Sequence, residues 1–170
     1  MVDSGDELVD VVDDEDRVVA TVPRREVRER HLLHRCTYVL VRNPEGLINV
    51  HRRTETKDTF PSAYDMLPGG VCASGETYDE CVRRELAEEL GIEGAEPEFL
   101  FLHRYEGPDG RALGAVYDVT WDGPIRNQES EVAWSAWVTP VELDRMLAER
   151  EFCTDSREIF ELLRGDRLGS

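Results

Sequence analysis

Residues 70–92 read GVCASGETYDECVRRELAEELGI and predict a glycine turn followed by a helix. Ser74 and Thr77 are the candidate N-cap residues, because their short polar side chains accept hydrogen bonds from the free backbone N–H groups of a first turn. Gly91 supplies the stop signal. An apolar stripe that would seat the helix on a sheet is formed by residues four apart, Val82, Leu86 and Leu90.

Three glutamates of the expected helix share one face beside that stripe. An advance of about 100° per residue places Glu85, Glu88 and Glu89 within one arc. Carboxylates roughly 5 to 6 Å apart repel each other by about 3 kcal/mol per pair at an effective dielectric near 20. A divalent cation bound between the carboxylates would replace this net repulsion with attraction, and oxygen ligands suit Mg²⁺ or Mn²⁺. An ordinary solvated helix is the alternative interpretation, because Glu and Arg are good helix formers.

The same segment resembles the signature of the Nudix hydrolase family. That signature is a glycine, five residues, Glu, seven residues, then Arg-Glu-apolar-any-Glu-Glu-any-Gly-apolar. Seven fixed identities arise by chance on the order of 10⁻⁸ times per starting position. The resemblance implies a Nudix box at residues 70–92 and indicates fold and reaction class more closely than substrate. Every position of the signature is matched in this sequence, by Gly70, Glu76, Arg84, Glu85, Leu86, Glu88, Glu89, Gly91 and Ile92.

Composition limits the class of protein and partner. A length of 170 residues predicts a single Nudix domain over residues 1–170. A formal charge of −17 argues against binding to nucleic acid polymers or anionic membranes, because like charges repel. No signal-like or membrane-spanning apolar run is present, so we expect a cytoplasmic protein. The cysteines have no zinc-ligand spacing and are expected to be reduced, mostly buried thiols: Cys36, Cys72, Cys81 and Cys153.

The order of the remaining elements predicts an α+β fold, with a mixed β-sheet sandwiched between helices (α/β/α). The Nudix fold implied by the resemblance is of this kind. Residues 7–22 alternate apolar and polar around an acidic turn, which predicts an N-terminal β-hairpin. Pro23 is the expected first residue of a short helix through residue 35. Further strands are expected at residues 36–41, 47–51, 97–105, 112–121 and 131–138, and helices at 140–150 and 155–164, the last capped by Asp155.

The flanks of the box carry cations on one side and spare carboxylates on the other. Arg53 and Lys57, the only lysine, lie in a loop that could fold over a bound diphosphate, although a solvated loop is the alternative. These flanks resemble isopentenyl diphosphate isomerases and the Nudix hydrolases closest to them. His34, Glu129 and Glu131 match the isomerase pattern, and the resemblance implies that Arg53 and Lys57 hold the diphosphate.

Two positions depart from the isomerase pattern. The resemblance implies a cysteine that protonates the substrate alkene and a histidine two residues later, and these places hold Gly69 and Val71. Cys72 is close in sequence, but we expect it to point elsewhere. Hydrolysis is therefore the predicted reaction, with isomerisation of isopentenyl diphosphate and a catalytically silent nucleotide-sensing module as alternatives.

The sequence thus predicts a metal-dependent hydrolase that cleaves a diphosphate linkage in a nucleoside diphosphate derivative or another organic diphosphate. Its partner is expected to be this small-molecule diphosphate, and the protein to be a monomer or homodimer. We expect Arg84 to orient the carboxylates with Glu76 as its structural partner. Glu89, or a carboxylate outside the box such as Glu129 or Glu131, is expected to take the proton of an attacking water. The predicted catalytic residues are Glu89, Glu85, Arg84 and Glu131, the substrate contacts Arg53 and Lys57, and the Mg²⁺ or Mn²⁺ ligands Glu85, Glu88, Glu89 and Gly70.

Overall fold

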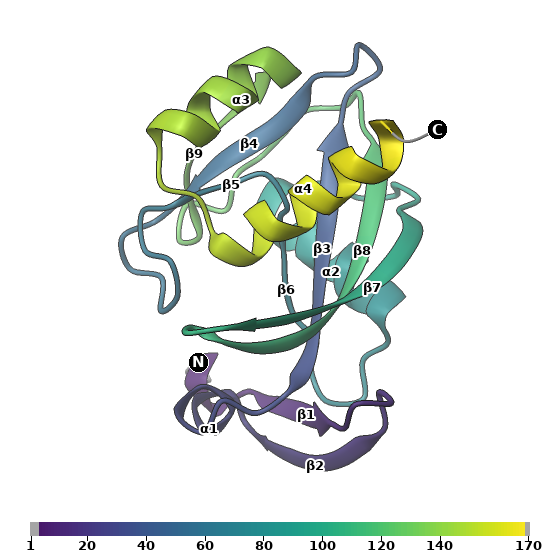
Figure 1. The fold of residues 1–170 in the computed structure, drawn as a ribbon, viewed down its shortest axis with the longest axis vertical. Helices are drawn as coiled ribbons and strands as arrows, with labels where there is room; N and C mark the ends of the chain where they lie inside the picture. Colours follow the sequence, from purple (N-terminus) through teal and green to yellow (C-terminus); the bar gives the residue numbers. More distant parts are fainter. Residues whose placement is uncertain (1–3, 169–170) are drawn as a thin grey trace.

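The sheet is built on strand β3 (His34–Arg42), which lies at the centre of the molecule (Figure 1). The computed structural model describes residues 4–168 of the chain. β3 runs antiparallel to β6 (Gly69–Val71) and parallel to β8 (Gly110–Thr120). β8 forms an antiparallel hairpin with β7 (Glu98–Gly107), and the mixed sheet is therefore as predicted.

Two smaller groups of strands extend this sheet from opposite ends of β3. At its start, β1 (Leu8–Val12) pairs with β3 and forms the predicted N-terminal hairpin with β2 (Val18–Pro23). At its end, β3 meets β4 (Ile48–Arg53), which pairs with β5 (Tyr64–Asp65) and β9 (Val132–Val138). Pairing of β5 with β4 and of β6 with β3 holds the chain between β4 and β6 beside the central strands.

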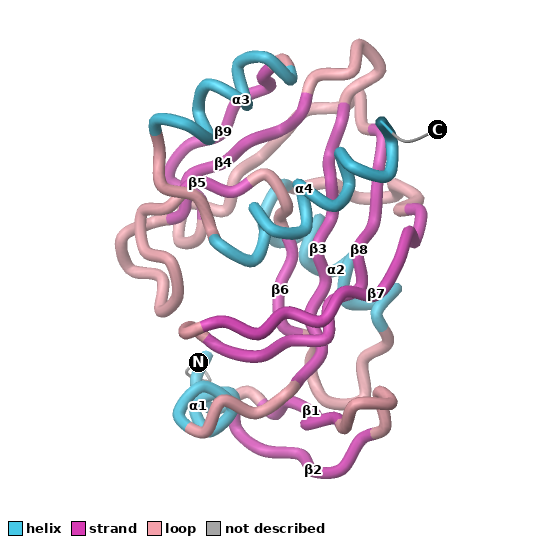
Figure 2. Tube along the Cα trace, viewed as in Figure 1, coloured by secondary structure: helices cyan, strands magenta, loops and turns pink. Residues whose placement is uncertain are grey.

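Helices cover both faces of the central sheet. α2 (Tyr78–Leu90) lies on one face and α4 (Thr154–Leu168) on the other, while α3 (Pro140–Glu149) lies along β4 and β9 (Figures 1 and 2). α1 (Arg24–Glu29) and the short 3₁₀ helix η1 (Ser4–Asp6) lie beside the N-terminal hairpin. No described helix is long and apolar enough to cross a membrane.

Alternation along β3 explains this layered arrangement, because successive strand side chains point to opposite faces. Val39 and Val41 pack with the predicted stripe of α2, whereas Cys36, Tyr38 and Leu40 pack with α4 and its neighbours. Two apolar clusters therefore form on the two faces of one strand. The predicted α/β/α sandwich is confirmed.

The ends of α2 follow local capping chemistry. Thr77 is the N-cap, and its side chain and that of Glu80 form a reciprocal capping box. Ser74, the other candidate, donates its hydroxyl to Asp10 in the N-terminal hairpin instead. Gly91 ends the helix with a φ of 64°, a left-handed conformation that glycine adopts at little cost.

Three predicted boundaries were wrong. Pro23 is the N-cap of α1 and the last residue of β2, one position before its predicted place. α1 ends at Glu29, and the residues from His34 onward join β3, because pairing with β8 overrides a weak helical propensity. α4 begins at Thr154, so Asp155 lies in its first turn. Short strands β5 and β6 were not predicted, because their pairing partners are distant in sequence.

The thiol prediction is confirmed, since all four cysteines are buried and free.

Replacing Leu86 with alanine tests the packing of α2 on the sheet. Leu86 is 1% exposed and packs against β3 and β8, so Leu86→Ala should lower the free energy of unfolding by roughly 2 to 5 kcal/mol. Leu162→Ala, on the exposed side of α4, is the matched control and should cost about 0.5 kcal/mol or less. Urea unfolding measures both, and equal losses would contradict the proposed packing.

Candidate active site

A cavity of about 370 Å³ lies beside the acidic face of α2. Its wall is assembled from segments that are far apart in sequence. These segments include the N-terminal residues before β1, α1, the start of β3, the loop after β4, the strand β6, the helix α2, the tip of the β7–β8 hairpin, the loop before β9 and the start of α4. In Figures 1 and 2 the loop after β4 and the hairpin tip project toward the same side of the molecule.

The predicted carboxylates of α2 line this cavity together. The side chain of Glu85 is 12% exposed and that of Glu88 is 52% exposed, and Glu89 is buried. The backbone N–H of Gly69 donates to Oε2 of Glu89 at 3.3 Å. A Cβ at Gly70 would lie 2.5 Å from Oε1 of Glu85, so a side chain there would displace this carboxylate from its present position.

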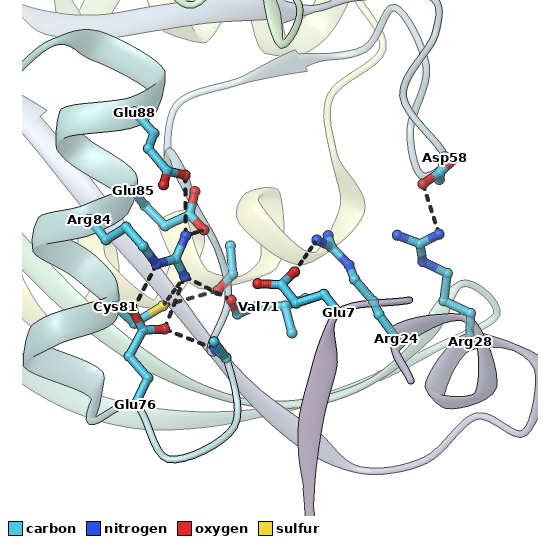
Figure 3. A network of polar contacts seen from close by, with 12 residues as sticks. Glu7, Arg24, Arg28, Asp58, Val71, Glu76, Cys81, Arg84, Glu85 and Glu88 are labelled. Carbon is cyan, nitrogen blue, oxygen red and sulfur yellow. Dashed lines mark hydrogen bonds and ion pairs between the residues drawn. The ribbon is translucent and has the colours of Figure 1, made fainter. Parts of the chain in front are cut away.

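Arg84 connects these carboxylates to the rest of the box (Figure 3). Its guanidinium donates to both carboxylate oxygens of Glu76, at 2.7 and 2.9 Å. It also donates to Glu85 at 2.8 Å, to Glu88 at 3.2 Å and to the carbonyl oxygen of Val71 at 3.2 Å. The predicted contact between Arg84 and Glu76 is therefore present, and one planar group fixes two of the three acidic side chains.

Burial changes the proton affinity of the acidic face. Burial raises the pKa of Glu89 well above its usual value, the nearby carboxylate of Glu85 adds to this, and Lys57 and Arg53 oppose it. Burial also raises the pKa of Glu85, while Arg84 lowers it. Two carboxylates are thus held where their negative charge is costly, and a hard divalent cation would relieve that cost. The residues present fit Mg²⁺ or Mn²⁺.

Lys57 and Glu131 form an ion pair with each other in the cavity wall. The sequence had placed them in separate roles, as a phosphate contact and a spare carboxylate. Arg53 also lines the cavity and donates to the backbone and side chain of Thr59, which orders the loop after β4. Glu129 is exposed and is not among the described residues that line the cavity.

Sequence reasoning missed the contribution of α1, which was expected only to lead into the core. Arg24 and Arg28 line the cavity opposite α2, where Arg24 approaches Glu7 and Arg28 bonds to Asp58 (Figure 3). The sequence feature that could have indicated this contribution is the spacing of four residues between Arg24 and Arg28, which places both side chains on one helical face. The buried Val27 lies between them in the sequence.

The floor of the cavity was also missed, since Asp155 had been interpreted only as a helix cap. The hydroxyl of Tyr38 donates to Asp155 at 2.9 Å, and the backbone N–H of Ser156 donates to the same carboxylate at 2.8 Å. Burial and the nearby Asp65 raise the pKa of Asp155 to about 6. Tyr38 and Asp155 therefore contribute a hydrogen-bonded polar pair to the cavity lining.

Comparison with known proteins identifies the family. The model of the NUDIX domain matches residues 32–163. The chain belongs to the Nudix family. It is accordingly a hydrolase that acts on diphosphate bonds, in a family that generally needs divalent metal ions and acts on small-molecule substrates.

Several relatives span nearly the whole chain. An uncharacterised Nudix hydrolase of Streptomyces coelicolor is 44% identical over 172 residues, covering 100% of this chain and 95% of that protein. The uncharacterised Nudix hydrolase YfcD of Escherichia coli K12 is 38% identical over 156 residues, covering 92% and 86% of the two chains. The crystal structure of DR0079 from Deinococcus radiodurans has a TM-score of 0.76 and 30% identity, covering 93% and 98%.

A more distant Nudix structure shares the fold alone. The Nudix domain of Shewanella oneidensis NrtR, solved in complex with ADP ribose, has a TM-score of 0.61 at 18% identity and covers 80% of this chain and 87% of that one.

Removing the buried charge at Glu89 should stabilise the metal-free protein. The pKa of Glu89 is raised in the folded state. Its contribution to the free energy of unfolding is therefore most favourable when the pH is below 4.5, the ordinary pKa of a glutamate, and is lost as the pH rises through the folded-state pKa. Glu89→Gln in EDTA at neutral pH should therefore raise the free energy of unfolding by roughly 1 to 3 kcal/mol. The gain should disappear near pH 4.5.

Urea titrations across this pH range measure the effect. Glu88→Gln, on the same helix but half exposed, is the control and should change metal-free stability little. A Glu89→Gln protein less stable than the parent at neutral pH would contradict the assigned cost of burial.

Proposed function

We propose that this Nudix hydrolase cleaves a diphosphate linkage in a nucleoside diphosphate derivative or another organic diphosphate, with Mg²⁺ as cofactor and Mn²⁺ as a possible substitute. The observation that carries the proposal is the partly buried Glu85 and the buried Glu89, held beside Arg84 in one cavity with Arg53 and Lys57. Acidic ligands and cations facing one cavity suit a metal-bound diphosphate.

Glu85, Glu88 and Glu89 are the proposed metal ligands, together with the carbonyl oxygen of Gly70. That carbonyl is directed toward α2, since the thiol of Cys81 donates to it at 3.7 Å. The chemistry that a bound divalent cation supplies is neutralisation of phosphoryl charge and a lowered pKa of the attacking water.

The proposed roles of the side chains follow from their surroundings. Arg84 keeps Glu85 and Glu88 aligned, and Glu89, whose charge a bound cation would stabilise, accepts the proton of the attacking water. Glu131 is the alternative proton acceptor, although it is already paired with Lys57. Transfer of Lys57 from this pair to a substrate phosphate would free the Glu131 carboxylate for that role.

A place in the isopentenyl diphosphate isomerase-like subgroup is proposed from the flanking residues alone, and isomerase activity is disfavoured. Gly69 has a φ of 152°, and a Cβ there would overlap the carbonyl oxygen of Thr37. A cysteine acid could not occupy this backbone without a shift of β3 or β6. Burial lowers the pKa of His34, and the nearby cations Arg24 and Arg28 lower it further. The positive charge of these arginines makes this a poor environment for a second metal ion.

We further propose that residues 1–170 form a single domain, because α1 and the Nudix box line the same cavity. A cytoplasmic location belongs to this proposal and rests on the pattern of apolar residues in the sequence. A monomeric or homodimeric state rests on the family resemblance.

Hydrolysis can be tested with a panel of organic diphosphates, by phosphate release with a coupled phosphatase in Mg²⁺ and then in Mn²⁺. Glu89→Gln should lower kcat by about 100-fold or more on every substrate that the parent cleaves, since it removes the proposed proton acceptor. Glu93→Gln, an exposed residue just beyond the box, should leave kcat unchanged. A fully active Glu89→Gln enzyme would refute the assigned role, and tight nucleotide binding without turnover would favour the silent module.

The isomerase alternative is tested separately with isopentenyl diphosphate in heavy water. No deuterium should enter the substrate, because the position of the protonating cysteine is occupied by Gly69. Clear incorporation, measured by mass spectrometry, would reverse the ranking of the two reactions.

A further inference from the structure

The ring of Phe60 lines the cavity from a backbone conformation that bulky residues rarely adopt. Phe60 lies in the loop after β4 and has a φ of 49°, in the left-handed region. Among the described residues other than glycine, a positive φ also occurs at Asp16, His31 and Ser62. Aspartate and histidine are comparatively frequent in this region, whereas a bulky apolar residue there is an outlier that the surrounding structure must enforce.

Core packing does not account for this conformation. Phe60 is partly buried and belongs to none of the apolar clusters that the described residues form. The tyrosine rings of the cavity wall differ, because Tyr38 and Tyr105 are buried and their hydroxyls donate to carboxylates. Backbone strain that the core does not offset is typical of positions that contact a ligand.

The backbone around Phe60 is connected to the cations proposed to bind the diphosphate. Nε of Arg53 donates to the carbonyl oxygen of Thr59 at 3.1 Å, and the N–H of Ala63 donates to that of Phe60 at 3.2 Å. Lys57 precedes Phe60 by three residues in the same loop and also lines the cavity. A substrate whose diphosphate contacts Arg53 and Lys57 would therefore have its organic part in the cavity that the Phe60 ring lines.

We propose that Phe60 is the platform on which a planar base of the substrate stacks, so that the organic diphosphate is a nucleotide. The inference rests on the proposed function, because it places the diphosphate at Arg53 and Lys57. Every nucleobase has a π face that stacks on an aromatic ring, whereas an isoprenoid chain or a sugar has none. Phe60 therefore selects the class of the organic group and leaves the choice among bases to other residues.

Non-cleavable analogues, in which a methylene group replaces the bridging oxygen of the diphosphate, separate binding from turnover in Mg²⁺. The set contains nucleoside analogues with adenine, guanine, cytosine or uracil, the analogue of ribose 5-diphosphate without a base, and the analogue of isopentenyl diphosphate. Titration calorimetry measures their dissociation constants. The parent should bind at least one nucleoside analogue about 5-fold to 100-fold more tightly than the base-free analogue.

Substitutions at Phe60 test whether its ring causes this preference. Phe60→Leu keeps an apolar side chain but removes the ring, so it should lower the preference to about twofold or less, whereas Phe60→Tyr should retain it. Ser62→Gly is the matched control, because Ser62 has a φ of 62° in the same loop but is not among the described residues that line the cavity. It should keep the parental preference.

Phe60→Gly separates the platform from a structural role. Glycine relieves the strained φ and removes the ring, so the midpoint of thermal unfolding should stay at or above that of the parent while the preference is lost. A lower midpoint would show that the ring is needed for packing and would count against the platform. In proton NMR spectra of the parent, resonances of the Phe60 ring should shift with the preferred nucleoside analogue but not with the base-free one.

Each of three binding results would overturn the inference. The first is a parent that binds no nucleoside analogue more tightly than the base-free analogue, and the second is a parent that binds the isopentenyl analogue most tightly. The third is a folded Phe60→Leu protein with the parental preference. If the parent cleaves none of the broad diphosphate panel, the proposed function fails, whereas binding of the non-cleavable analogues still decides the platform.

Discussion

The guanidinium group of Arg84 holds the acidic side of the Nudix box in one arrangement. It bonds to both oxygens of Glu76 and at the same time to Glu85 and Glu88. Burial disfavours the charge on Arg84, but bonding to Glu76 and the nearby Glu85 raises its pKa overall, so it remains cationic whatever the solution pH. Without this fixed positive charge, the carboxylates of α2 would repel one another and spread into solvent.

Burial of the apolar stripe on α2 gives that arrangement its place in the fold. Leu86 and Leu90 are buried against β3 and β8, and this contact aims the adjacent acidic stripe at the cavity. Gly70 then permits β6 to lie against Glu85. The same helix therefore contributes to stability with one face and to the candidate site with the next, so a change in its packing would also displace the carboxylates.

Charge in the cavity is organised differently from charge on the chain as a whole. The protein carries a formal charge of −17, yet the cavity wall collects cations from α1, from the loop after β4 and from α2 itself. The same wall also holds more carboxylates than cations, so a bound divalent cation would be needed to offset the repulsion of an anionic substrate. Tyr38 and Asp155 add polar groups to this wall.

The sequence by itself determined the elements whose signals are local. Spacing within residues 70–92 was sufficient to predict α2 and the shared face of its three glutamates, because a helix repeats at a fixed angle and its caps lie within a few residues. The Nudix fold was implied by the resemblance of the same segment to the family signature. Arg53, Lys57 and Glu131, which the resemblance had implicated, line the same cavity as these glutamates.

Only the tertiary structure decided which distant groups meet. It paired Lys57 with Glu131, left Glu129 outside the cavity, and brought Arg24 and Arg28 from α1 to face Glu85. It also converted residues 34–35 from a predicted helix into the start of β3. These outcomes depend on strand pairing and on packing between segments far apart in the chain, and no local periodicity encodes such long-range contacts.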